Sequence, residues 1–227
     1  MLLPKISYNS GKLLPNPQTV ALSVLSVNES YSNVTVLHVL FGQLLKHDIA
    51  LSPQPQDANG RNMKCNCNDT RNSLCMVVQM PTNNTINREI SCLAIPRTSS
   101  SNINWNCFSS FREQINKLTS WLDLSQIYGT NSIVASSLRN ATDSGFLNSQ
   151  ILTGFNRSVF TAGPSGSNQC LRDTKQMPCF KSGEERTNEN TALTALQAIF
   201  LRQHNLIAEK LQIMTGLSGE ILFQETR

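Results

Sequence analysis

The sequence feature that most constrains the fold is the segment of residues 191–214, TALTALQAIFLRQHNLIAEKLQIM. Its apolar residues recur about every 3.6 positions, which is the period of an α-helix with one buried face. Asn188 and Asn190 precede it as candidate N-caps, because an asparagine side chain can accept a hydrogen bond from the first turn. This segment predicts a long helix. Since no series of alternating strands is visible, the chain as a whole is predicted to be mainly helical.

Two other segments have helical character. Residues 33–49 are predicted to form a mostly buried helix from the spacing of Val36, Leu37, Leu40, Leu44 and Leu45. Residues 112–129 begin as an amphipathic helix, which Gly129 can end. Residues 1–18 and 130–185 contain irregular stretches rich in Pro, Asn and Ser, with short helices expected in the second.

Cysteines and glycosylation motifs both indicate an oxidising compartment. Residues 51–107 hold five of the seven cysteines, and so long a loop needs covalent ties. The six Asn-x-Ser/Thr motifs predict a secreted or luminal glycoprotein; they start at Asn28, Asn33, Asn68, Asn83, Asn140 and Asn156. The first residues, MLLPK, lack the features of a signal peptide, so we expect a fragment of a secreted protein.

Composition excludes several classes of protein. The 227 residues are 39% hydrophobic and 15% charged, with a net charge of +4, which is typical of a globular chain of one or two domains. This excludes gross disorder and fibrous repeats. The charge is small and unclustered, so it gives no reason to expect a nucleic-acid partner. The longest apolar runs fall far short of the ~20 residues of a transmembrane helix.

The motif GQLLKHD, residues 42–48, is the first candidate site. On a helix, Gln43 and His47 lie one turn apart and can point into one cavity, whereas Asp48 is turned about 100° away. A histidine that exchanges a proton near neutral pH, beside an amide that can hold water or a small anion, suits peroxide chemistry. Alone the pair is weak evidence, because a lone histidine at a helix end is more often structural.

Two more segments carry chemistry. If residues 119–125 form a loop, the oxygens of Thr119, Asp123 and Ser125 can surround a hard cation; the alternative is an amphipathic helix with these residues on its wet side. Ahead of the long helix, the helix dipole accounts for acidic residues but not for Arg186. This arginine therefore needs another partner, such as a carboxylate, a propionate or a developing anion.

Three motifs in one order, FGQLLKHD, REQINKLTSWLDLSQIYGT and RTNEN…ALQAIFLRQHNLIAEKL, resemble the animal haem peroxidase family, which includes myeloperoxidase-like and peroxidasin-like enzymes. The resemblance covers roughly residues 12–227. It implies a mainly α, animal haem peroxidase-like fold with long disulfide-tied loops, incomplete at both ends. Residues 1–227 would be the distal half of the domain.

The resemblance also implies residue roles. His47 matches the distal histidine that moves a proton between the peroxide oxygens, Gln43 the distal glutamine that binds water or halide, and Arg186 the distal arginine. Glu189 matches a glutamate that forms an ester with haem b. A calcium site is implied by the match of Asp48, Thr119, Trp121 through its carbonyl, Asp123 and Ser125. The family's pattern further suggests the pairs Cys65–Cys75, Cys67–Cys92 and Cys170–Cys179, which leave Cys107 for a partner.

Two departures from the family pattern qualify this expectation. Lys46 stands where many members have a second ester-forming aspartate, so one covalent haem link is lost. The proximal histidine lies far downstream of the distal arginine in the family, whereas His204 belongs to the helix motif and His38 is expected to be packed. We therefore expect the complete parent to be a secreted peroxidase, with this fragment inactive alone. It would use hydrogen peroxide and a halide or phenolic donor; the alternative is an inactive calcium-binding adhesion module.

Overall fold

The computed structural model of the chain describes most of its residues. They are residues 7, 9–25, 33–80, 90–101, 113–152, 154, 156–163, 170 and 178–227.

The chain divides into two compact units, and each is discontinuous in sequence. Unit 1 comprises Met1–Ser32 and Leu51–Lys117, and unit 2 comprises Asn33–Ala50 and Leu118–Arg227. The candidate residues of the two helical motifs and of residues 119–125 all belong to unit 2. Among the described helices, none has the length and apolar character that crossing a membrane requires.

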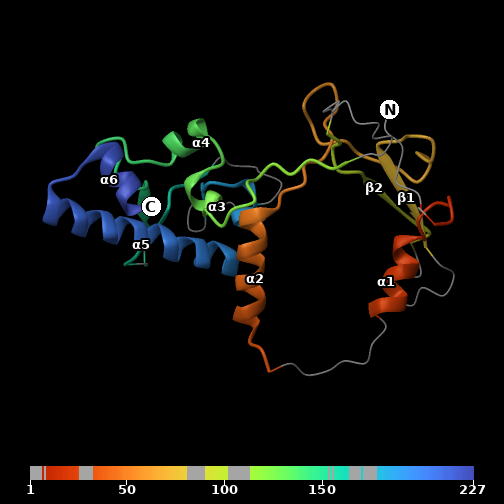
Figure 1. Cartoon of the computed structure of the whole chain (residues 1–227), viewed down its shortest axis with the longest axis horizontal. Helices are drawn as coiled ribbons and strands as arrows, with labels where there is room; N and C mark the ends of the chain where they lie inside the picture. The colour runs from red at the N-terminus through yellow and green to blue at the C-terminus, as the bar shows by residue number, and fades with distance from the viewer. Residues whose placement is uncertain are drawn as a thin grey trace. The chain divides into compact units, whose positions relative to one another are not determined.

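Unit 2 is built around one long helix, α5 (Thr191–Thr215), which is drawn in blue in Figure 1. The helix begins at Asn190, whose side chain accepts a hydrogen bond from the N–H of Leu193, and ends at Gly216 in a left-handed conformation. It packs against other elements of the unit (Figure 1): α2 (Val36–Ile49), α3 (Ser125–Tyr128), α6 (Gly219–Thr226), the 3₁₀-helix η1 (Glu185–Asn188) and strand β4 (Ser158–Phe160). The prediction of a long helix is confirmed, and of the two candidate caps, Asn188 and Asn190, it is Asn190 that caps it.

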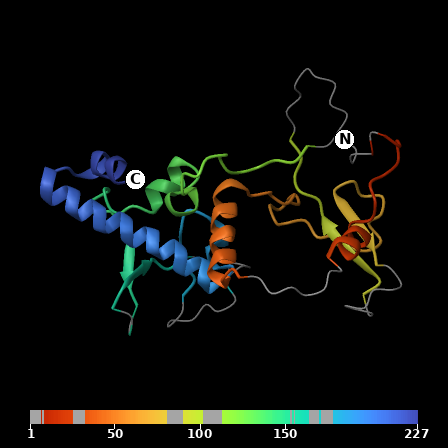
Figure 2. The same ribbon diagram turned by 60° about the horizontal axis from the view of Figure 1, so that its bottom comes forward.

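The hydrophobic core of unit 2 lies where α3, α5 and α6 meet. It contains side chains exposed by a few per cent at most: Ile127, Tyr128, Leu138, Leu147, Phe160, Ala198, Leu201 and Phe223. A short antiparallel hairpin of β3 (Ser149–Ile151) and β4 (Ser158–Phe160) lies against α5 and contributes Phe160 to this core (Figure 2). Helix α4 (Ser132–Ser137) follows α3 and buries none of its residues.

Unit 1 contains helix α1 (Pro17–Leu25) and an antiparallel pair of strands, β1 (Cys75–Gln79) and β2 (Cys92–Pro96). In the register of this pair, Cys75 lies opposite Pro96 and Gln79 opposite Cys92. Two disulfides, Cys65–Cys75 and Cys67–Cys92, connect one loop to both strands. The expected covalent ties of the Cys-rich region are confirmed, although the strands themselves were not predicted.

The third expected disulfide, Cys170–Cys179, is also present, and it lies in unit 2. Cys107 falls outside the described residues, so its pairing stays a prediction. The prediction of a mainly helical chain with long disulfide-tied loops is confirmed.

Two predictions about helices are wrong. Helix α2 forms where expected, but it is not mostly buried, because only Leu44, His47 and Asp48 are covered. His38 is likewise exposed rather than packed. The helix expected over residues 112–129 is present only as α3; in the described part, residues 113–124 form an extended loop in which Gln114 bridges to Ser100 and the Lys117 N–H bonds to the Leu51 carbonyl.

Candidate functional site

The first group of site residues lies on the last two turns of α2. His47 is 3% exposed and Gln43 is half-buried, one turn before it. Both reach toward the segment just before α5: the Gln43 amide bonds to Glu189 and Asn190, and the His47 ring to Glu184. Asp48 is also buried but bonds to Leu124, in agreement with the expectation that it faces a different site.

Glu184 connects the candidate histidine to the candidate arginine. Its Oε1 lies 2.9 Å from Nδ1 of His47, and its Oε2 accepts from Nε of Arg186 at 2.7 Å. The carboxylate side chain is only 1% exposed, so both bonds form in a medium of low polarity where they are strong. Because a carboxylate only accepts, Nδ1 of His47 carries a proton, and this fixes the orientation of the ring.

The remaining donors of Arg186 explain its position near a helix start. Nη1 donates to the carbonyl of Ala50 and Nη2 to that of His47, each at 3.0 Å. These carbonyls lie at the C-terminal end of α2, where the dipole favours a cation. Arg186 thus neutralises the end of α2 and the buried carboxylate of Glu184, which is the kind of partner that its unusual place in the sequence predicted.

Glu189 lies on the open side of His47. Its Oε2 is 3.3 Å from Nε2 of His47 and 3.4 Å from Nε2 of Gln43, while half of its side chain (51%) is exposed. His47 therefore has one nitrogen on a buried carboxylate and the other on a carboxylate that solvent can reach. This second nitrogen is the one available to a ligand.

Residues that the sequence analysis did not single out complete the buried network. Gln197 of α5 donates to Oε1 of Glu184 at 3.1 Å and is within 3.0 Å of Oε1 of Gln126, whose own amide donates to the carbonyl of Leu44. Nothing in the sequence motifs predicted a role for Glu184 or Gln197. A signal was present for Gln197, because it interrupts the apolar face of α5 and is fully buried.

Gly183 allows Glu184 to reach this network. A Cβ at position 183 would clash with backbone atoms of Ser125, Gln126 and Gly129. The chain before η1 therefore packs directly against the backbone of α3, which only glycine permits.

The expected calcium ligands come together in a loop next to α2. Asp48 accepts from the Leu124 N–H at 3.0 Å and from the Ser125 hydroxyl at 3.4 Å. Asp123 accepts from the Thr119 hydroxyl and from the Ser125 N–H, each at 3.0 Å. Four of the five expected ligand residues are thus linked by hydrogen bonds, and the loop rather than the amphipathic helix is the correct alternative for residues 119–125.

The chemistry of this loop fits a hard cation. Burial raises the pKa of Asp48, and the nearby charge of Asp123 raises it further. A cation would relieve both costs, and carboxylate and hydroxyl oxygens are the ligands that calcium prefers. Leu124 has φ 54° and ψ 35°, the one positive φ among described residues other than glycine, so the loop stores strain at its centre. The side chain of Trp121 is 76% exposed, which leaves its expected role to the carbonyl.

The other two histidines do not approach this site as metal ligands. His204 is buried with Nδ1 3.1 Å from the Tyr128 hydroxyl and Nε2 3.1 Å from the Gly145 carbonyl, so both nitrogens are used. Burial lowers its pKa. His38 lies on the exposed surface of α2. Of the three histidines, His47 is therefore the one that belongs to this site.

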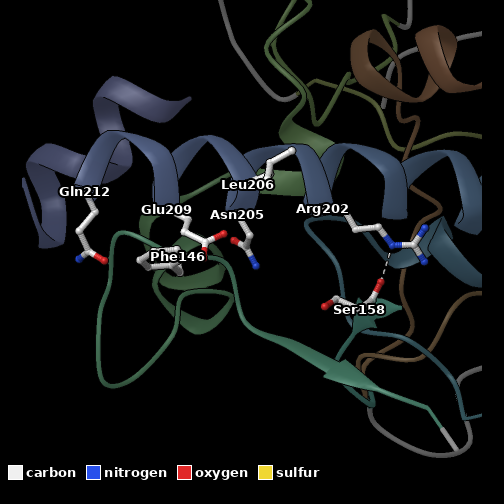
Figure 3. Close-up of a pocket in the computed structure, with 7 residues that line it drawn as sticks. All are labelled: Phe146, Ser158, Arg202, Asn205, Leu206, Glu209 and Gln212. Atoms are coloured by element: carbon white, nitrogen blue, oxygen red, sulfur yellow. Dashed lines mark hydrogen bonds between the residues drawn. The ribbon is translucent and has the colours of Figure 1, made fainter. Parts of the chain in front are cut away.

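A surface pocket lies along α5 and contains none of the residues discussed above (Figure 3). Three of its polar side chains already have partners: Arg202 donates to the Ser158 carbonyl, Gln212 to Asp143, and Asn205 exchanges two hydrogen bonds with the backbone of Leu147. These groups anchor loops to α5, so the pocket is a packing seam and not the candidate active site.

Comparisons with known proteins identify the family. The model of the family "Animal haem peroxidase" matches residues 3–227. Peroxidasin from Drosophila melanogaster is 32% identical over 96% of this chain and 15% of its own length, and thyroid peroxidase from Sus scrofa is 30% identical over 99% of this chain and 26% of its own length. The structure of peroxidase A from Dictyostelium discoideum has a TM-score of 0.68 at 19% identity, covering 99% of this chain and 44% of that one.

The chain therefore spans about a quarter or less of the length of these two relatives. The similarity to the structure of peroxidase A supports the assignment of the fold. The match of the family model along almost the whole sequence establishes which family the chain belongs to. This chain belongs to the animal haem peroxidase family.

Proposed function

We propose that this chain supplies the distal side of a secreted, calcium-containing haem peroxidase that reduces hydrogen peroxide and oxidises a halide or a phenolic donor. The observation that carries the proposal is the convergence of Gln43, His47 and Glu189 on one open face. Family membership supports haem as the cofactor. Haem, when bound, exchanges electrons with peroxide and with the donor.

In this proposal, His47 moves the proton. Its Nδ1 is committed to Glu184, so Nε2 is the atom that takes a proton from one peroxide oxygen and returns it to the other. The carboxylate of Glu189 competes for Nε2 in the chain alone. An ester between Glu189 and haem b, as the family resemblance suggests, would remove that carboxylate and leave Nε2 free as a base.

Arg186 and Gln43 have supporting roles in the proposal. Arg186 holds Glu184 and the end of α2 in place, and the family resemblance implies that its charge also favours negative charge on the departing oxygen. Gln43 offers a hydrogen bond to water or a halide. Lys46, which is exposed, cannot replace the second ester, so haem would have one covalent link at most.

In this proposal, calcium has a structural role and holds the residues of the site in place. Asp48 directly follows His47, and the loop of Thr119, Trp121, Asp123 and Ser125 would close the ion against the end of α2. An ion there would hold the last turn of α2 and so the direction of the imidazole. Three disulfides and exposed acceptor asparagines at positions 33, 68 and 156 support a secreted glycoprotein.

The test supplies haem together with free imidazole, which can act as an iron ligand on the face opposite His47. With both added, we expect a Soret band and peroxide-dependent oxidation of guaiacol, and His47→Ala should slow the reaction with peroxide by roughly 10²–10⁴-fold. His38→Ala, an exposed histidine of the same helix, is the matched control and should have no effect. Equal rates for His47→Ala and the unaltered chain would contradict the proposal.

A second candidate function is a catalytically inactive calcium-binding or adhesion module. Lys46, which stands where many family members have an ester-forming aspartate, favours it. Calcium-dependent thermal stability without any reaction with peroxide in the haem-loaded protein would support this candidate over the first.

A further inference from the structure

Asn190 has two contacts of different kinds. Its Oδ1 accepts the N–H of Leu193 at 2.7 Å, which caps α5. Its Nδ2 donates to Oε1 of Gln43 at 3.0 Å, across the space between α5 and α2. One side chain thus joins the start of the long helix to the candidate site.

The cap determines which way both amides face. A backbone N–H can only donate, so the oxygen of Asn190 must face Leu193, and its NH₂ group must face Gln43. Gln43 must then present its own oxygen to Asn190. Its NH₂ group is left on the opposite end of the amide, where it lies 3.4 Å from Oε2 of Glu189.

We propose that Asn190 is a positioning residue that fixes the Gln43 amide with its NH₂ group toward Nε2 of His47, so that the site receives an anion or an oxygen lone pair. This inference rests on the proposed function and extends it from the presence of Gln43 to the direction of its dipole. Reversal of the Gln43 amide would place its NH₂ group against the NH₂ group of Asn190 and its oxygen against the carboxylate oxygen of Glu189.

Glu189 marks where such a ligand would lie. The same oxygen, Oε2, contacts both Gln43 Nε2 and His47 Nε2, and its side chain is half exposed. A carboxylate oxygen is a hydrogen-bond acceptor with negative charge, as is a halide ion. The position therefore suits a small anion and does not suit a cation, because Gln43 offers its donor end.

The experiment uses bromide as the probe and the ¹⁵N–¹H resonances of the Gln43 side chain as the readout. Titrations are made in protein carrying Glu189→Ala, so that the chain's own carboxylate does not compete. In this background Asn190→Ser retains a capping oxygen but loses the amide donor, since serine caps helices about as well as asparagine. Asn190→Asp also retains the cap but turns an acceptor toward Gln43. The matched control is Asn131→Ser, which alters the N-cap of α4.

We expect bromide to shift the Gln43 side-chain resonances, with a Kd that rises about tenfold in Asn190→Ser and further in Asn190→Asp, while Asn131→Ser leaves it unchanged. Protection of α5 amides from exchange should persist in both Asn190 variants. Absence of a response of Gln43 to bromide, or the same Kd with and without the Asn190 amide, would overturn the inference. Since no haem is used, this result is separate from the His47→Ala test, which can fail while amide orientation is still measured.

Discussion

The two units differ in what holds them together. Among the described residues, unit 1 buries only Cys75, Val78 and Cys92, and two of these three belong to disulfides. Unit 2 has a continuous core of aromatic and aliphatic side chains and, beside it, a buried polar network around Glu184. The difference indicates that covalent ties replace apolar burial in unit 1, whereas unit 2 has enough burial to keep charged groups inside.

The same difference explains why the candidate site lies in unit 2. A catalytic constellation needs side chains that are fixed by packing on more than one element. In unit 2, α2, η1 and α5 each contribute residues to the network, and the core beneath them resists rearrangement. Disulfides restrict the loops of unit 1 but leave most of its side chains exposed.

The largest effect is expected from Leu201→Ala in the core of unit 2. Leu201 is 1% exposed, and its truncation should lower the free energy of unfolding of this unit by about 4 kcal/mol through lost burial and a cavity. Hydrogen exchange resolved by region is the measurement, with β1 and β2 as internal reference. Ile213→Ala, at a position 78% exposed on the same helix, should change little. Equal loss of protection in both units would show that they unfold as one.

Removing Cys67–Cys92 should produce the reverse pattern. The double variant Cys67→Ser, Cys92→Ser opens a link across 25 positions and should destabilise unit 1 by about 3 kcal/mol. Exchange of the β1 and β2 amides should accelerate, while the amides of α5 keep their protection. The corresponding change at Cys170 and Cys179, which are nine positions apart in unit 2, is the control. A stable unit 1 without this disulfide would show that its fold does not depend on the covalent tie.

Glu184→Gln tests the buried network of unit 2. The variant keeps the shape of the side chain but removes the charge that pairs with Arg186 and orients His47. We expect a loss of stability of about 2 kcal/mol, measured by urea unfolding followed through the amides of α5. Glu185→Gln, at an exposed neighbour, provides the comparison. If both variants are equally stable, the network contributes nothing to the fold.

The smallest effect concerns pH. Burial lowers the pKa of His204 from its ordinary value of 6.5, so the folded state binds its proton less readily than the unfolded state. The resulting stability of unit 2 is present above pH 6.5 and is lost as the pH falls through the lowered pKa. In unit 1, hydrogen bonds from the Arg61 and Asn59 N–H groups and from the Arg61 side chain lower the pKa of Asp57. The stability that Asp57 contributes is therefore lost only when the pH falls below 3.8, the ordinary pKa of the group.

As the pH is lowered from 7.5 to 5, the midpoint temperature of thermal unfolding should therefore fall for unit 2 before it falls for unit 1. His204→Gln, which can still bond to Tyr128 and Gly145, should flatten that pH dependence. A curve that is unchanged by the substitution would assign the dependence to other groups.

Local pattern was sufficient for several features. The apolar period of residues 191–214 predicted α5, the asparagines before it predicted its cap, and the helical spacing of residues 42–48 predicted that Gln43 and His47 lie one turn apart. Each of these features depends only on neighbours along one helix. For residues 113–124, the same reasoning from local spacing predicted the wrong structure. Their spacing permits a helix, but backbone bonds to Leu51 and Ser99 and the contacts of Asp48 favour a loop, and these partners are distant in sequence.

By itself the sequence determined the family, the main helix, the cysteine pairs suggested by the family pattern and the identity of the candidate site residues. Tertiary structure alone decided that Glu184 bridges His47 and Arg186, that Gln197 joins them, and that α2 leaves much of its apolar surface exposed. The physical reason is the distance along the sequence over which each interaction acts. Helical period and capping act over a few residues, whereas a buried carboxylate acquires its role only when the fold brings its partners, 137 positions apart in the case of His47, into contact.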